Sequence, residues 1–487
     1  LVEFQDQKFA LNIGDPKERI TEMLNGDNYT FQGAEGSARE FYRYTSAGKF
    51  TPKFNVVGPV VCSKNEVEYV TPSEKDYLPG STTQECYPAS RMIEEAVKLV
   101  DDEIDFSKYD MDSDGFVDFV YVFFAGRGAT TGGNSKTTIW PHAFTLTAGI
   151  GAPVELDGVK INRYCCSAET GSKGKLSGIG TFCHEFGHVL GLPDLYDTAN
   201  NGQVSKCFTP GSYDCMDAGN YNNSEHTPAT FSIYEQYALE WTKPVEITGS
   251  ANITMIPLAA RPFGYKVNTN RAKTEYFMLE NRGPIANDYY LEGHGMLAWH
   301  IDFNLDAWTR NVPNNLADHQ RIDIEEADAS PDISSRAGDV FPGTAGVHEF
   351  QSFGRPGFCD WDYEGTGYEI TEIIRHADGT ISFKVTADEG NEMTEARIGT
   401  PVAEVVATSA TTATLKWQPV DNADSYMVSV YDPSLFDGNL LKDYVEGYCF
   451  KSVGDATTTE ITGLEPGKHY AAFVYALNEY NASRTPM

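Results

Sequence analysis

The chain has 487 residues, 70 of them acidic and 37 basic, and its formal net charge is −33. This charge argues against nucleic acid and anionic membrane surfaces as partners, because phosphate binding needs clustered lysine and arginine. With 41% hydrophobic and 12% aromatic residues the chain can bury substantial cores, and its length predicts about two to four domains.

The start of the chain and its apolar runs bear on location. No run of 18 or more apolar residues occurs, so the sequence predicts no transmembrane helix. The first residue is Leu1, and the opening LVEF is typical of the middle of a strand. We therefore expect that something upstream was removed, either a signal peptide and pro-segment, which favours export, or a stretch that was trimmed from the chain.

Residues 1–244 alternate predicted helices with buried strands. Helical patterns run over 15–25, 35–44 and 89–104, and the last has the strongest period. The apolar run FVDFVYVFFAG at 116–126 is typical of a buried central strand. This alternation favours an α/β or α+β domain up to roughly residue 240.

Near Pro244 the sequence pattern changes from alternating helices and strands to short strands. Short strand signals separated by turns predict a β-rich unit over 245–387, and the acidic, polar stretch 388–401 is typical of a linker. Residues 402–487 contain alternating strands typical of a β-sandwich. In this last unit LEPGKHY places Tyr470 six residues after Leu464, beyond a Pro-Gly turn, and Trp417 lies early in the core. These features resemble the tyrosine corner and core tryptophan of fibronectin type III domains.

The stretch LSGIGTFCHEFGHVLGLPD, residues 176–194, carries the candidate metal site. On a helix His184 and His188 share one face and can bind one ion, while Glu185 is rotated away and can reach a bound water. This is the zinc peptidase arrangement, with two histidine ligands and a glutamate base. A catalytic zinc takes three protein ligands and keeps one position for water.

A third ligand is needed, and Asp194 is the leading candidate. Gly191 lets the helix end in a sharp turn, and the chain after Pro193 can return toward the metal. Glu235, on a later predicted helix, is the alternative, but that scheme uses a longer uninterrupted helix than Gly191 allows. A metal-free buried helix with two hydrogen-bonded histidines is the plain alternative, which leaves Glu185 buried without a purpose. His142 and His300 are treated as structural histidines.

The pattern HEFGHVLGLPDLYD resembles the signature of the immune inhibitor A family of secreted metallopeptidases, within the metzincin clan. GSYDCMDAG, residues 211–219, resembles the family's methionine-containing turn, with Met216 at the Met position 22 residues after Asp194. The resemblance covers nearly all of 1–387 and implies an α+β metzincin-like catalytic domain in 1–244, with zinc on His184, His188 and Asp194. Some metzincins have a tyrosine two residues after this methionine, where this chain has Ala218, so no tyrosine is assigned to stabilise the oxyanion.

A second metal site is predicted in DMDSDGFVDF, residues 110–119. The positions that supply ligands in a calcium loop are 1, 3, 5, 7 and 9, and here they are Asp110, Asp112, Asp114, Phe116 and Asp118. Phe116, at position 7, would bind through its backbone carbonyl, and Gly115 is at position 6. The twelfth position is Tyr121 rather than a glutamate, and a strand follows, so the loop is not a complete EF-hand. Because clustered carboxylates repel each other without a cation, we expect a structural calcium ion, with a solvated polar loop as the alternative.

Together these patterns predict a zinc-dependent endopeptidase that is secreted or held on the cell surface and acts on protein or peptide substrates. A water activated by Glu185 would attack the peptide carbonyl. The alternative from another class is a catalytically silent adhesin or carbohydrate-binding surface protein on a peptidase scaffold. A zinc hydrolase acting on a non-peptide amide is a further alternative.

Overall fold

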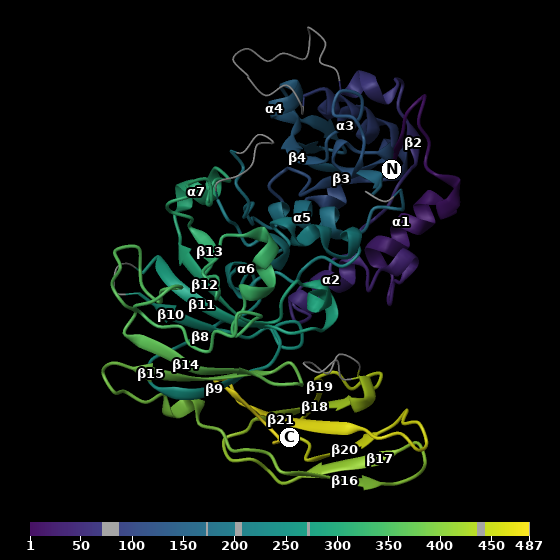
Figure 1. Cartoon of the computed structure of the whole chain (residues 1–487). Helices are drawn as coiled ribbons and strands as arrows, with labels where there is room; N and C mark the ends of the chain where they lie inside the picture. Colours follow the sequence, from purple (N-terminus) through teal and green to yellow (C-terminus); the bar gives the residue numbers. More distant parts are fainter. Residues whose placement is uncertain (71–86, 172–173, 200–206, 270–272, 436–443, 487) are drawn as a thin grey trace. The chain divides into compact units, whose positions relative to one another are not determined.

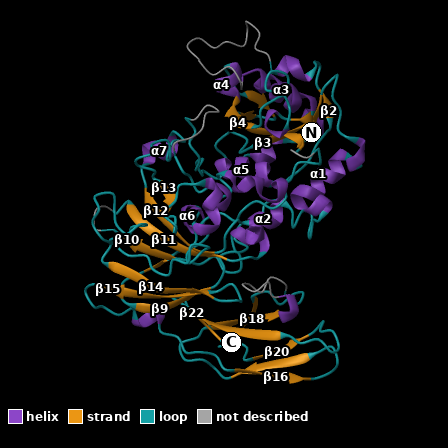
Figure 2. Cartoon of the chain, in the orientation of Figure 1, coloured by secondary structure: helices purple, strands orange, loops and turns teal. Residues whose placement is uncertain are grey.

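A computed structural model describes residues 1–70, 87–171, 174–199, 207–269, 273–435 and 444–486. Over these residues the chain divides into two compact units. The first contains 1–44, 48–194 and 214–229, and the second contains 45–47, 195–213 and 230–487. Figure 2 shows that the longer helices gather in the first unit and strands dominate the second.

The first unit is built on a sheet with the strand order β2-β1-β3-β7-β4. Strands β2, β1, β3 and β7 are parallel, and β4 joins the edge in antiparallel direction. The bounds are β1 Val2–Glu3, β2 Val60–Val61, β3 Val120–Arg127, β4 His142–Thr145 and β7 Arg163–Thr170. A small antiparallel pair, β5 Val154–Leu156 and β6 Val159–Ile161, lies outside this sheet. The predicted central strand is confirmed as β3, which begins four residues later than its apolar run because 110–119 is a loop.

Four helices of the first unit form where the sequence patterns predict them, although the one predicted over 89–104 ends at Leu99, and a fifth, α4, was not predicted. They are α1 Pro16–Asn25, α2 Ala38–Thr45, α3 Tyr87–Leu99, α4 Leu146–Ile150 and α5 Gly180–Val189. Helix α1 shows the local reason plainly: Asp15 caps it by accepting a hydrogen bond from the Glu18 N–H, and Pro16 occupies the first turn.

Helices α3 and α5 cover opposite faces of the sheet (Figure 1). Alternate residues of a strand point to opposite faces. Val122 and Phe124 of β3 join the core that contains Met92 and Ile93 of α3. Tyr121 and Phe123 instead meet the ring of Phe182 on α5, at 4.6 and 5.9 Å between ring centroids. The strand therefore holds α5 in place from one side.

The second unit begins with a sheet of order β13-β12-β11-β10-β8 and a sheet of order β14-β15-β9. Its elements up to residue 387 are α6 Ile233–Ala238, β8 Val245–Glu246, β9 Ala251–Met255, β10 Tyr265–Asn268, β11 Glu275–Arg282, β12 Gly295–Asp302, α7 Leu305–Thr309, β13 Ile322–Ile324, β14 Tyr368–Arg375 and β15 Ile381–Ala387. Both sheets contribute to one buried core. The β-rich character predicted for 245–387 is confirmed.

Two further sheets, β16-β17-β20 and β19-β18-β21-β22, enclose a shared core that contains Trp417, Val428 and Val474. The strands are β16 Ala403–Ala407, β17 Ala413–Trp417, β18 Ser425–Tyr431, β19 Lys451–Gly454, β20 Thr458–Ile461, β21 Ala471–Leu477 and β22 Ala482–Arg484. The predicted β-sandwich is confirmed. Tyr470 accepts a hydrogen bond from the Glu465 N–H at 2.9 Å, the kind of backbone contact that defines a tyrosine corner.

The predicted domain boundaries differ from the division into units. Residues 195–213 and 230–243 belong to the second unit although they precede residue 244. The stretch predicted as a linker, 388–401, buries Met393 and Ala396 in the core of the preceding sheets. A buried ion pair between Asp378 and Arg484, 2.7 Å long, also ties the sandwich to the β-rich part. The boundaries at 244, 387 and 401 stay predictions.

In the part of the chain that the structure describes, no helix is both long enough and apolar enough to span a membrane.

Candidate metal centre

Helix α5 carries His184 and His188 on one face. Their rings lie 4.9 Å apart between centroids and are nearly perpendicular, at 87°. The helix is buried along most of its length. Tyr42 donates a hydrogen bond of 2.7 Å to the Cys183 carbonyl, which also holds the helix from the side of α2. The two imidazoles are therefore presented by a helix that packing holds in place.

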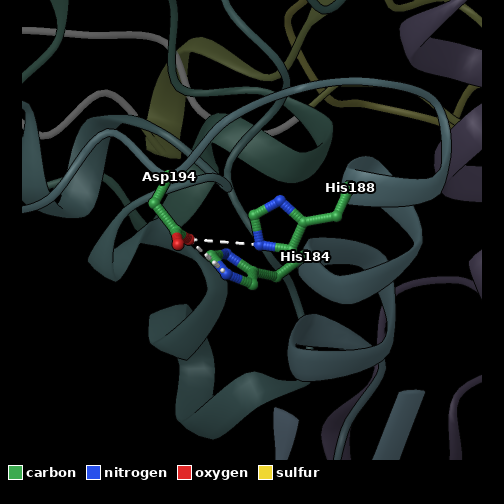
Figure 3. A group of neighbouring side chains, drawn as sticks. All are labelled: His184, His188 and Asp194. Carbon is green, nitrogen blue, oxygen red and sulfur yellow. Dashed lines mark ion pairs between the residues drawn. The ribbon is translucent and has the colours of Figure 1, made fainter. Parts of the chain in front are cut away.

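The end of α5 brings Asp194 back to the histidines. Gly191 adopts a φ of +100°, a left-handed conformation that glycine takes without steric cost. The Leu192 N–H then bonds to the Gly187 carbonyl at 3.1 Å, so the chain leaves the helix axis at once. The Oδ1 atom of Asp194 lies 3.0 Å from His184 Nε2 and 3.2 Å from His188 Nε2, as Figure 3 shows.

A hydrogen bond from the Nδ1 atom, the ring nitrogen that does not face Asp194, fixes the orientation of each histidine. His184 Nδ1 donates to the Cys215 carbonyl at 2.9 Å, and His188 Nδ1 donates to the Leu192 carbonyl at 2.8 Å. Since a carbonyl can only accept, the proton of a neutral imidazole lies on Nδ1, and Nε2 carries a lone pair. Such backbone partners fix the tautomer of metal-binding histidines.

The Nε2 atoms of His184 and His188 and the Oδ1 atom of Asp194 face one another. All three are hydrogen-bond acceptors, and all lie within 4.8 Å of one another. Two imidazole lone pairs and a carboxylate oxygen repel unless a proton or a cation lies between them. Nitrogen and oxygen donors of this kind suit zinc. We call His184, His188 and Asp194 the histidine site. Its donor set fits a divalent transition metal, and it joins the ligands predicted from the sequence.

Without an ion, a proton fills the same place. Burial lowers the pKa of His184, but the bond to Asp194 outweighs burial and raises that pKa to about 9. Burial would raise the pKa of Asp194, yet hydrogen bonds from His184 and His188 hold it well below its usual range. The carboxylate therefore stays charged and ready to bind a cation.

Glu185 is the residue predicted as the base. It lies one residue after His184, about 100° around the helix, and is 8% exposed. Burial raises the pKa of its carboxyl, and His184 and His188 lower that pKa only in part. A carboxylate with a raised pKa is a stronger base than one in water. Glu185 thus combines a location next to the histidine site with the proton affinity that the predicted role needs.

Met216 and Glu235 have different surroundings. Met216 is fully buried, its N–H bonds to Asp214 Oδ1 at 2.7 Å, and it directly follows Cys215, whose carbonyl orients His184. Glu235 caps α6 by accepting from the Ser232 N–H at 2.8 Å. Among the described residues, the group of ligands around His184 contains Asp194 and not Glu235. The alternative third ligand is not supported.

The histidines treated as structural have protein partners. His142 Nε2 lies 3.0 Å from the Tyr164 hydroxyl, and its Nδ1 donates to the Trp140 carbonyl. The Nε2 atom of His300 lies 3.0 Å from Glu275 Oε1, and its Nδ1 atom lies 3.3 Å from Glu325 Oε1.

The predicted calcium loop, residues 110–118, is called the acidic loop. Oxygens of Asp110, Asp112 and Asp114 lie within 4.8 Å of one another, and Gly115 has a φ of +86°. The carboxylates also accept from the loop itself: the Asp114 N–H donates to Asp110 at 3.0 Å and to Asp112 at 3.2 Å.

Asp118 is not part of that group of ligand atoms, and its carboxylate accepts weakly from the Met111 N–H at 3.4 Å. The Phe116 N–H bonds to Asp114 at 2.8 Å. Calcium in this loop stays a prediction, because exposed acidic groups that accept from their own backbone do not require an ion.

Sequence reasoning missed the backbone partners of the histidines and the segment after Met216. That segment, the 3₁₀ helix η8 Ala218–Glu225, packs against α5. The run NYNNSE is rich in residues that tolerate left-handed backbone, which was the available signal. It brings the Asn220 carbonyl against Gly180, the first residue of α5.

Comparisons with known proteins agree with this geometry. Residues 15–243 match the model of the immune inhibitor A peptidase M6 catalytic domain. "Immune inhibitor A" of Bacillus thuringiensis subsp. alesti is 27% identical over 214 residues, 38% of this chain and 30% of that protein. "Pre-pro-metalloprotease PrtV" of Vibrio cholerae serotype O1 is 27% identical over 201 residues, 37% of this chain and 20% of that protein. The chain thus matches under a third of the length of these relatives.

Solved fibronectin type III structures align with about a fifth of the chain. The FN5 domain of Drosophila Lar is 20% identical, covers 19% of this chain and 99% of that domain, and gives a TM-score of 0.15. The fn3 domain of human collagen alpha-1(XX) is 26% identical, covers 20% of this chain and 94% of that domain, with a TM-score of 0.15. Scores of this size carry no argument, so the sandwich rests on its own strands.

The match to the catalytic-domain model contains the whole histidine site, Glu185 and Met216. With this match, the resemblance seen in the sequence is confirmed: residues 15–243 are similar to the catalytic domain of the immune inhibitor A family of M6 peptidases.

Proposed function

We propose that the protein is a zinc-dependent endopeptidase that hydrolyses peptide bonds within protein substrates. The observation that carries this proposal is the histidine site itself: three acceptor atoms converge from α5 and the turn after it, beside the buried carboxylate of Glu185. When bound there, zinc supplies a Lewis acid that polarises a carbonyl and lowers the pKa of a water.

The residues of the chain handle orientation and protons. His184, His188 and Asp194 would hold the ion, with the Cys215 and Leu192 carbonyls fixing the imidazoles. Glu185 accepts one proton from the attacking water as the oxygen bonds to the peptide carbon. It then delivers that proton to the amide nitrogen as the carbon–nitrogen bond breaks, so one water is consumed and an acid and an amine form.

The test is hydrolysis of unfolded casein by the wild type and by Glu185→Gln, with zinc content measured on both. We expect Glu185→Gln to keep zinc and to lose activity by about 10²–10⁴-fold. Glu155→Gln, on an exposed position of β5, is the matched control and should cleave at the wild-type rate. Mass spectrometry of the fragments should show internal cuts, as an endopeptidase requires.

Two results would contradict the proposal. If both proteins hold zinc and neither cleaves any unfolded protein, a silent adhesin or a hydrolase of non-peptide amides becomes the better explanation. If Glu185→Gln cleaves as fast as the wild type, the base role fails while the peptidase assignment stands.

Three finer assignments are proposed alongside the activity. Secretion or surface display is supported by the similarity to the immune inhibitor A family, and fractionation of the producing cells tests it. Met216 is proposed to line the floor beneath the histidines as in metzincins, supported by its burial beside Cys215. The C-terminal sandwich is proposed as fibronectin type III-like, supported by the Tyr470 contact.

A further inference from the structure

A groove with a volume of about 690 Å³ lies on the small sheet β14-β15-β9 of the second unit (Figure 2). Because successive residues of a strand point to opposite faces, Phe383 of β15 enters the core, while its neighbours Ser382 and Lys384 face the groove. Their partners across β9 are Thr254 and Asn252, in that order. The floor of the groove is therefore a row of hydrogen-bonding side chains.

One buried asparagine holds the groove in shape. Asn481, which is 3% exposed, donates from Nδ2 to the Asn252 carbonyl at 2.9 Å and to the Ala396 carbonyl at 2.8 Å. Its Oδ1 atom accepts from the Thr254 N–H at 2.9 Å. These bonds tie β9 to the stretch 392–400, which forms one wall of the groove. The groove is therefore formed before a ligand arrives, which lowers the entropic cost of binding.

Strand β14 contributes a strained residue to the groove. A bulge shifts its register between Thr371 and Ile374, and Glu372 within the bulge has a φ of +55°. Glycine usually takes such a left-handed position in a bulge. His348 holds the bulge, because its carbonyl accepts from the Ile373 N–H at 3.0 Å and its Nδ1 atom donates to the Ile373 carbonyl at 2.7 Å. Strain that the surroundings maintain in this way often marks a functional position.

The bulge changes which side chains reach the groove. An unbroken register would bring Ile373 opposite Ser382, on the groove side. Ile374 takes that place instead, and Ile373 is fully buried in the core. Glu372 is exposed and lines the groove together with Ile374, which is 48% exposed. The bulge thus presents a carboxylate and an aliphatic side chain to the groove.

The side chains that line the groove indicate which class of ligand it suits. Lys384 and Glu372 are both exposed, and neither forms an ion pair with another described residue. Among the described residues of the lining, the one aromatic ring is that of Phe383, which is 3% exposed and belongs to the core. Without an exposed ring face, the groove is poorly suited to sugars and flat apolar molecules. Free charges of both signs, uncharged polar groups and an aliphatic side chain instead suit an extended polypeptide.

We propose that this groove, here called the docking groove, binds an extended segment of the protein substrate other than the segment that is cleaved. The inference rests on the proposed function and adds a second place where the substrate is held. Lys384 would pair with an acidic side chain of the segment and Glu372 with a basic one, while Ile374 would contact an apolar one. A substrate held here keeps the rest of its chain at a high local concentration, which favours its capture by the active site.

The experiment measures kcat and KM on two substrates, unfolded casein and a fluorescence-quenched peptide just long enough to be cleaved. The variants are Lys384→Glu and Glu372→Gly. Each should raise KM for casein roughly fivefold, because a charged contact is reversed or lost, and should leave kcat unchanged. The short peptide should be cleaved with the kcat and KM of the wild type. Glycine adopts left-handed backbone freely, so the Tm of Glu372→Gly should stay the same or rise.

The chain offers a matched control for each variant. Lys416 is an exposed lysine of β17 that forms no ion pair with another described residue, and Glu240 is an exposed glutamate with a φ of +58°. Lys416→Glu and Glu240→Gly make the same chemical changes elsewhere in the second unit. Both should cleave casein as the wild type does. Because variant and control change the net charge equally, net charge is removed as an explanation.

A binding measurement separates docking from catalysis. On a Glu185→Gln background, fluorescence anisotropy of labelled casein reports the affinity directly. Lys384→Glu should weaken this binding by the same factor by which it raises KM, whereas Lys416→Glu should not weaken it. Sedimentation velocity of the same proteins shows whether copies of the chain associate through the docking groove.

The failures are distinguishable. If the wild type cleaves casein and both groove variants keep its KM within about twofold, the docking groove is overturned while the peptidase stands. If Lys384→Glu impairs the short peptide as much as casein, the substitution acts on the active site or the fold, and the inference is overturned. If it abolishes self-association and leaves casein binding intact, the occupant is a second copy of this chain, which also overturns the inference.

The proposed function can fail separately. If the wild type cleaves no unfolded protein, the peptidase assignment fails and the anisotropy measurement decides the role of the docking groove. Weaker casein binding by Lys384→Glu than by Lys416→Glu would then support a polypeptide site, and equal binding would overturn it.

Discussion

The histidine site and the acidic loop each bring three ligand side chains within 4.8 Å, yet their surroundings differ. His184 and Asp194 are 6% and 5% exposed, whereas Asp112 and Asp114 are exposed. In the histidine site, bonds to backbone carbonyls turn the lone pairs toward one another. In the acidic loop the carboxylates already accept backbone N–H groups of the same loop. Closeness of ligands is therefore a weaker sign of a metal than lone pairs left facing each other.

The largest expected effect comes from removing one ligand in each region. Asp194→Ala should lose zinc and lower casein hydrolysis by roughly 10³-fold or more, because several kcal/mol of transition-state stabilisation depend on the ion. Asp114→Ala should keep both zinc and activity. Metal analysis and a casein assay on the purified variants check this. Equal zinc loss in both variants would remove the distinction between the two regions.

Selective chelation comes next. Phenanthroline should abolish activity, and added zinc should restore it. EGTA should spare activity at first and, if the acidic loop holds calcium, lower Tm by a few degrees, since an ion bound only to the folded state stabilises it. Scanning calorimetry with and without each chelator measures both effects. An unchanged Tm in EGTA would favour a solvated loop without calcium.

A matched pair of glycine substitutions gives a smaller effect. Gly191→Ala and Gly115→Ala each place a side chain at positive φ, at +100° and +86°, which costs about 1–2 kcal/mol of unfolding free energy. Only Gly191→Ala should also weaken zinc binding, by about tenfold, because Asp194 follows that turn. Urea unfolding of the zinc-free proteins and competition with a zinc-binding dye separate the two costs. Equal zinc affinity in both variants would show that the turn does not position the ligand.

The smallest effect concerns pH. Burial, followed by the charges of Asp112, Asp110 and Asp114, raises the pKa of Asp118. The folded state then binds this proton more tightly than the unfolded state, whose carboxyl titrates near about 3.9. The stabilisation is complete below that value and is lost as the pH rises through the folded pKa.

In EGTA, the Tm of the wild type relative to Asp118→Asn should therefore fall as the pH rises above about 4. Solvent screening keeps this change small because the loop is exposed. Calcium should flatten the slope if it binds. A constant difference between the two proteins across this range would show that Asp118 feels no such repulsion.

Local patterns predicted the elements that carry the site. The apolar run before residue 126 identified β3, and the spacing of His184, His188 and Asp194 identified the group that the structure brings together. Both depend on interactions within a few residues: helical periodicity, and a glycine that ends a helix. Such information is present in any short window of the sequence.

Contacts distant in sequence escaped prediction. The carbonyl that orients His184 belongs to Cys215, 31 residues away, and nothing near either residue predicts that pairing. The polar stretch 388–401 has the composition of a linker, yet tertiary packing buries Met393 and Ala396 within it. Composition reports average polarity, whereas burial depends on the few apolar residues that find a core.

The division of the chain between its units has a consequence for biogenesis and engineering. Asp194 is the last residue of the first unit before the chain passes to the second, and residues 214–229, including the carbonyl that orients His184, return to the first unit 19 residues later. During synthesis His184 leaves the ribosome before Cys215, whose carbonyl orients it 31 residues later in the chain. A catalytic unit cannot be transplanted as one cassette. A chimera must exchange interleaved segments together, with junctions at residues 194, 213 and 229.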